Sequence, residues 1–206
     1  MPAATWGISS RPIFSKMAAV SASPLALSWA TAVGIVSKPR AFYDDWVRVA
    51  QDEAEHFALL SHRLVDMDTN YGDLPAHLGM WRAAQDTGRD VLGRLAVVPM
   101  VLEARGLDVT PGMIEIFRKA HDPAAQKAVA ALEVIYAEEV HHVAYGSKWF
   151  HFLCGREDID PKEAFHALVK RYFHGALKPP FNEEKRAEAG IPPDFYWPLT
   201  QGNPAG

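Results

Sequence analysis

With 206 residues, the chain is long enough for one domain with a complete hydrophobic core. Its hydrophobic content of 49% and charged content of 22% are ordinary for a globular protein, and a net charge of −4 gives no overall basic surface for nucleic acid. Cys154 is the single cysteine, which excludes an internal disulfide and a cysteine-rich zinc site and suits a reducing compartment.

The N-terminal segment, residues 1–40, differs from the rest of the chain in charge. All 25 acidic residues lie at or after Asp44, and residues 17–37 carry no charge. Three interpretations stay open: a first bundle helix, an acid-poor and Ser-rich leader that targets an organelle, or an altered gene start. A transmembrane span is the weakest interpretation, because Ser, Thr, Pro24 and Gly34 dilute the apolar run.

Helical periodicity dominates the rest of the chain, and no segment alternates with strand periodicity for long enough to build a sheet. The expected fold class is therefore all-α. Proline-rich residues 178–206 predict an extended tail that packs its Phe and Trp side chains on the helices or is disordered. The predicted elements, in chain order, are a helix over 41–64, a loop near 70–75, a helix over 78–105 kinked at Pro99 and ended by Gly106, a short helix over 111–120, a long helix over 123–154, and a helix from 161 to about 175.

Two Glu-x-x-His pairs lie on the apolar stripes of two of these helices. They are Glu53/His56 in the first predicted helix and Glu139/His142 in the long one. Helical residues three apart point the same way, so each pair can offer one oxygen and one nitrogen to a common metal. A charged residue on a core stripe is costly unless it is paired or binds a metal. A buried polar network without metal also fits, although it needs many satisfied hydrogen bonds.

Two further matches to the same spacing serve as a contrast. Glu138/His141 lie one position off the inward register, so we expect them to support the ligands or to face solvent. Glu163/His166 lie off the core face of their helix and are predicted to be a solvated surface pair. The helical face, not the spacing, therefore selects the first two pairs.

A third carboxylate, Glu103, follows Ala96 and Pro99 at helical spacing and can point inward beside the Glu139 pair. The corresponding position of the first half lies near Met17, where no acidic residue exists. Carboxylate and imidazole ligands suit iron or manganese. A complete di-metal cage has six such side chains. The five expected metal ligands are Glu53, His56, Glu103, Glu139 and His142.

Five stretches of the chain together form a specific pattern. They are AFYDDWVRVAQDEAEHF (41–57), YGDLPAH (71–77), VLEARGLDVTPGM (101–113), EVIYAEEVHHVAYGSKWF (133–150) and GALKPPFN (175–182). They resemble an uncharacterised ferritin-like family, the domain-of-unknown-function 455 family. The resemblance implies a ferritin-like four-helix bundle over 41–177, with an extra C-terminal helix, the tail 178–206 and a di-metal carboxylate site built from the five ligands above. In such proteins the first helix contributes a further Glu, which residues 17–37 do not offer.

The resemblance implies an oxidoreductase or hydroxylase that holds two iron or manganese ions, if the site is complete, and uses dioxygen on an unknown small-molecule substrate. The alternative is a metal-depleted or single-metal helical bundle that acts as an interaction or structural protein, which the missing carboxylate favours. We expect neither DNA nor a membrane as partner, and a homodimer is compatible with the sequence. The expected localisation is cytoplasmic, with organellar targeting by residues 1–40 left open.

Overall fold

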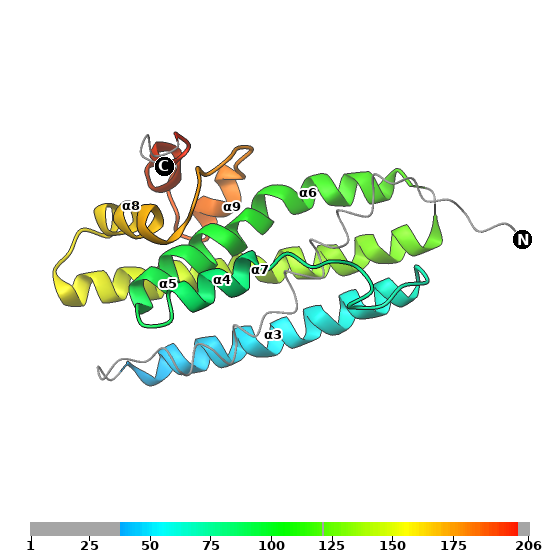
Figure 1. Cartoon of the computed structure of the whole chain (residues 1–206), viewed down its shortest axis with the longest axis horizontal. Helices are drawn as coiled ribbons and strands as arrows, with labels where there is room; N and C mark the ends of the chain where they lie inside the picture. The colour runs from blue at the N-terminus through cyan, green and yellow to red at the C-terminus, as the bar shows by residue number, and fades with distance from the viewer. Residues whose placement is uncertain (1–37, 121, 202–206) are drawn as a thin grey trace, which may run out of the picture.

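The computed structural model describes residues 38–120 and 122–201, and this part of the chain is all-α, without β-strands (Figure 1). The interpretations of the N-terminal segment concern residues that lie, up to residue 37, outside the described part. Among the described helices, none combines the length and the hydropathy that a membrane crossing requires. The helices are α3 (Arg40–Val65), α4 (Gly79–Asp86), α5 (Val91–Val97), α6 (Ala104–Arg118), α7 (Pro123–Glu157), α8 (Pro161–Tyr172), α9 (Glu183–Glu188) and α10 (Pro193–Tyr196), with a π-helix η1 at Val98–Glu103 and a 3-10 helix η2 at Trp197–Leu199.

The two longest helices, α3 and α7, lie side by side along the long axis of the molecule, and α6 packs along α7 (Figure 1). Both long helices were predicted from their apolar stripes and are confirmed, with α7 ending three residues later than expected. Aspartate side chains cap the starts of α7 (Pro123–Glu157) and α8 (Pro161–Tyr172). The side chain of Asp122 accepts a hydrogen bond from the amide of Ala124, and that of Asp160 accepts one from the amide of Glu163.

The helix predicted over 78–105 is broken in the structure. The chain leaves α4 after Asp86 and restarts at α5, where the side chain of Asp90 caps the amide of Gly93 at 2.8 Å. Pro99 then lies in η1, not at a simple kink. Proline lacks an amide hydrogen and its ring excludes the carbonyl one turn earlier, so the backbone takes a wider turn here.

The predicted stop at Gly106 and the short helix over 111–120 are both wrong, because α6 continues through Gly106 and Pro111 without a break. An interior glycine and an interior proline together cost a helix about 4 kcal/mol. Ile114 and Phe117 are buried in the core beside α7 and contribute about 1.5–3 kcal/mol each. Tertiary packing therefore outweighs the local propensity that the prediction used.

The chain after α8 is folded into short helices, so the prediction of an extended tail is corrected. Its buried side chains pack on the face formed by α6, α7 and α8. The guanidinium of Arg186 donates two hydrogen bonds to the carboxylate of Asp108, at 2.8 and 2.7 Å, in a fully buried pair. Prolines in this region mark the starts of short helices, which α10 and η2 illustrate.

Two separate hydrophobic clusters form the core. One contains Trp46 and Val49 of α3 together with Trp149 of α7. The other contains Leu60 of α3 and Leu132 of α7. Along both helices a layer of buried charged and imidazole side chains lies between the two clusters. The molecule thus places a polar layer inside its core, and this layer is the candidate site.

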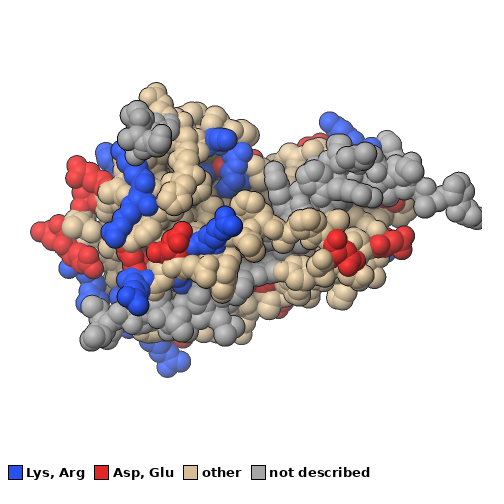
Figure 2. Space-filling view, viewed as in Figure 1, with Lys and Arg blue, Asp and Glu red and all other residues tan. Residues whose placement is uncertain are grey.

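The face of the molecule drawn in Figure 2 shows no comparable concentration of charge among the described residues. On the face shown in Figure 2, Lys and Arg side chains are interspersed with Asp and Glu among the described residues. This mixed distribution agrees with the small net charge of −4. It offers no broad basic patch on that face of the kind that nucleic acid requires.

Candidate metal centre

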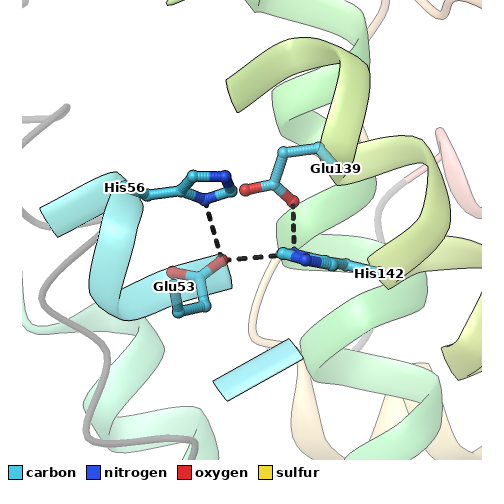
Figure 3. Close-up of side chains that lie close together, drawn as sticks. All are labelled: Glu53, His56, Glu139 and His142. Carbon is cyan, nitrogen blue, oxygen red and sulfur yellow. Dashed lines mark ion pairs between the residues drawn. The ribbon is translucent and has the colours of Figure 1, made fainter. Parts of the chain in front are cut away.

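Four buried side chains of the two long helices converge on one point (Figure 3). Glu53 and His56 come from α3, and Glu139 and His142 come from α7. One potential ligand atom from each lies within 4.8 Å of the other three. The exposed fraction is 7% for Glu53, 1% for His56, 5% for Glu139 and 0% for His142. The helical spacing of three residues explains why each pair points inward together.

The two imidazoles direct the same atom toward the carboxylates. Oε1 of Glu53 lies 3.5 Å from Nδ1 of His56 and 3.3 Å from Nδ1 of His142. Oε2 of Glu139 lies 3.7 Å from the same Nδ1 of His142. The ring centroids are 5.6 Å apart. Glu53 therefore lies between the two rings, and both Nδ1 atoms face the interior of the cluster.

The outer nitrogen of each ring is held by an acidic residue of the opposite helix. Nε2 of His56 lies 2.7 Å from Oε2 of Glu138, and Nε2 of His142 lies 3.3 Å from Oδ2 of Asp52. A carboxylate on one ring nitrogen fixes that nitrogen as the donor and leaves the other as the metal-binding lone pair. The partners thus assign the hydrogen to Nε2 and the free lone pair to Nδ1 when the rings are neutral.

This crossed arrangement has a signal in the sequence that the motif analysis missed. Each Glu-x-x-His pair is preceded by an acidic residue, which gives Asp52-Glu53 in α3 and Glu138-Glu139 in α7. Glu138 was expected either to support the ligands or to face solvent, and its half-buried side chain contacts His56. Asp52 was not selected at all, because it lies beside the apolar stripe and only the pairing of α3 with α7 brings it to the opposite ring.

Several buried polar atoms in and beside the cluster have no hydrogen-bond partner. Leaving one such atom unsatisfied costs about 1–3 kcal/mol. A group of them at one point is therefore expensive for a protein that uses it only as a polar network. A bound cation would satisfy them together, since all are lone-pair donors when deprotonated. In the cluster these atoms are Oε2 of Glu53, Nδ1 of His56, Oε2 of Glu139 and Nδ1 of His142, and Oε2 of the buried Glu103 is a further one outside it.

Glu103, the fifth expected ligand, ends η1 and is 6% exposed. It is not one of the four side chains whose ligand atoms lie mutually within 4.8 Å. Burial raises the pKa of its carboxyl well above the ordinary value, and the negative charge of Glu139 raises it further. Glu103 is thus an electrostatic neighbour of the cluster and can carry a proton there.

The cluster as a whole retains protons. Burial disfavours the charged form of His142, but the adjacent Glu139 and Glu53 carboxylates together act more strongly and raise the pKa of the ring to about 11. Burial raises the pKa of Glu139. Burial would also raise the pKa of Glu53, yet the imidazoles of His142 and His56 lower it overall. A metal cation bound among these side chains would have to displace such protons.

The remaining Glu-x-x-His match lies elsewhere. Glu163 is exposed at the start of α8, whereas His166 is half-buried and its Nε2 lies 3.0 Å from the carbonyl oxygens of Asp194 and Phe195. The expected solvated pair is therefore corrected, because the folded tail covers the imidazole. His166 does not belong to the cluster and serves as a natural control for it.

Comparisons with known proteins give the family. Residues 9–197 match the family described as "Protein of unknown function (DUF455)", a match that extends beyond both ends of the stretch that carried the resemblance. A protein of Haemophilus influenzae described as uncharacterized is 40% identical over 151 residues, which make up 73% of this chain and 51% of that protein. The chain therefore spans about half the length of this relative. No solved structure matches. On the family match, the chain belongs to the DUF455 family.

Proposed function

We propose that this chain is a ferritin-like metal-carboxylate protein in which Glu53, His56, Glu139 and His142 bind iron or manganese and Glu103 acts as a further ligand. The observation that carries the proposal is the convergence of buried donor atoms without hydrogen-bond partners on facing helices. Mixed carboxylate and imidazole donors suit these two metals better than a thiolate-preferring ion. The carboxylate behind each ring orients its lone pair inward, as metal-bound histidines require.

The proposed activity is oxidation of an unknown small-molecule substrate with dioxygen. A pair of iron or manganese ions would supply the electrons and the Lewis acidity for that reaction. The chain's own contribution would be positional and electrostatic. Glu53 lies between both rings, Asp52 and Glu138 hold the ring orientations, and the buried Glu103 offers a further carboxylate. The hydrophobic clusters on both sides keep the centre dry.

A second candidate is a single-metal or metal-depleted bundle that serves as an interaction or structural protein. Two observations favour it. No Asp or Glu precedes Asp44, so the sequence before α3 offers no sixth carboxylate. The four converging side chains also form a compact group, which could hold a single ion. The two candidates differ in the number of metals each chain holds.

Elemental analysis of protein reloaded anaerobically with iron or manganese distinguishes them. We expect two ions per chain in the wild type, loss of metal in His142→Ala, and wild-type content in His166→Ala. One ion per chain would favour the single-metal candidate, and none in well-folded protein would reject metal binding. Dioxygen uptake by the reduced, iron-loaded protein then tests the redox activity, and uptake no faster than that of His142→Ala would contradict it.

A further inference from the structure

The π-helix η1 and the long helix α7 meet at a glycine. A Cβ atom placed on Gly146 would lie 2.4 Å from both Cβ and Cγ of Pro99. Carbon atoms in contact lie about 3.5–4.0 Å apart, so any side chain at Gly146 would push η1 away by about 1 Å. Gly155, further along the same helix, has no atom within 4 Å of a corresponding Cβ. The close approach is thus a local property of the Gly146–Pro99 contact.

This contact lies next to the candidate metal centre on both helices. Gly146 follows His142 by one helical turn on the buried face of α7. Pro99 and Glu103 belong to the same short π-helix, whose Val98 and Met100 are fully buried. A shift of η1 at Pro99 would therefore carry Glu103 with it.

We propose that Gly146 and Pro99 form a positioning contact that sets Glu103 against Glu139 and His142 and so makes Glu103 a metal ligand. This inference rests on the proposed metal-binding function. Metal–ligand distances tolerate only about 0.2 Å. A displacement of about 1 Å, the smallest that relieves the added Cβ, removes Glu103 from coordination while the helices persist. Gly146 acts through Glu103 and does not touch the metal.

Manganese(II) titrations followed by electron paramagnetic resonance test the proposal on the full chain. The variants are Gly146→Ala, Glu103→Gln, their combination, and Gly155→Ala as the matched control on the same helix. We expect Gly146→Ala and Glu103→Gln each to weaken binding at least tenfold, the usual scale for residues that orient metal ligands. Gly155→Ala should stay within about twofold of the wild type, since its added Cβ meets no neighbour. The combined variant should bind no more weakly than Glu103→Gln alone, because both changes remove the same ligand.

Three results would overturn the proposal. Wild-type affinity in Gly146→Ala is one. Losses that multiply in the combined variant are another, since they would show that Gly146→Ala disturbs the ligands of α7 and not Glu103. No manganese binding by the wild type would reject the proposed function and this inference together, whereas the first two results leave the metal centre standing. If circular dichroism shows that Gly146→Ala is unfolded, Pro99→Ala replaces it, because this change removes the proline ring from the contact. We expect Pro99→Ala to weaken manganese binding by the same tenfold, with no further loss when it is combined with Glu103→Gln. Wild-type affinity in Pro99→Ala would overturn the proposal.

Discussion

Metal binding at this centre is expected to release protons, and its affinity is expected to rise with pH. The pKa of His142 is raised to about 11 because the adjacent carboxylates of Glu139 and Glu53 outweigh the opposing effect of burial. At neutral pH the ring is therefore protonated in the metal-free protein. A metal ion accepts only the neutral imidazole, so it must displace this proton.

The magnitude follows from the distance between the pKa and the working pH. Neutral pH lies about four units below about 11, and each unit is worth about 1.4 kcal/mol, so removing the proton costs about 6 kcal/mol. One displaced proton makes the apparent affinity rise about tenfold per pH unit. Burial raises the pKa of Glu139, so toward lower pH this carboxyl must also release a proton and the affinity depends more steeply on pH.

The stability of the metal-free fold has the opposite dependence on pH. The raised pKa of His142 contributes stability that is complete below the unfolded value of 6.5 and is lost as the pH rises toward 11.

Isothermal titration calorimetry with manganese(II) measures both quantities. Titrations one pH unit apart around neutrality, each in two buffers of different ionisation enthalpy, give the affinity and the number of protons released. We expect at least tenfold tighter binding at the higher pH and at least one proton released per metal-binding event. The same affinity at both pH values, with heats that do not depend on the buffer, would refute the electrostatic argument.

Three further predictions concern single residues. Asp108→Ala leaves the guanidinium of Arg186 buried without its carboxylate, so the free energy of unfolding measured with urea should fall by about 3–5 kcal/mol, and an unchanged midpoint would contradict this. Asp52→Ala and Glu138→Ala each release one imidazole from its orienting partner and should weaken manganese binding about 10–100-fold. Circular dichroism should show an unchanged helix content in both variants. A change in affinity under about twofold in both would show that the rings need no such support. His166→Ala should keep the wild-type metal content, because its ring nitrogen contacts backbone carbonyls of the tail and lies outside the cluster.

Local periodicity predicted the parts of this molecule that local forces determine. The apolar stripes of α3 and α7 extend over many turns, so they give both the helices and the inward direction of Glu53, His56, Glu139 and His142. Buried charge on such a stripe is costly, so the residue pattern predicted that these side chains are paired or bind a metal. The packing of α3 on α7 then brings the two stripes face to face.

Other features depend on contacts between distant segments and were beyond a local pattern. Asp52 reaches His142 only because α3 and α7 pack together. Pro111 stays inside α6 because that helix packs along α7. Helix propensity scales do not include such packing between distant segments. The folded tail likewise depends on the buried pair between Arg186 and Asp108, residues far apart in the sequence. The sequence pattern predicted the four converging side chains more readily than Asp52 and Glu138, which contact their outer ring nitrogens.

The most direct test of the metal centre is a crystal structure of the manganese-loaded protein with an anomalous difference map. We predict metal peaks between α3 and α7, one within about 2–2.5 Å of Nδ1 of His56 and one within about 2–2.5 Å of Nδ1 of His142, with Nε2 of each ring still held by Glu138 and Asp52. A map without a peak at these points, or a metal bound through Nε2, would contradict this prediction.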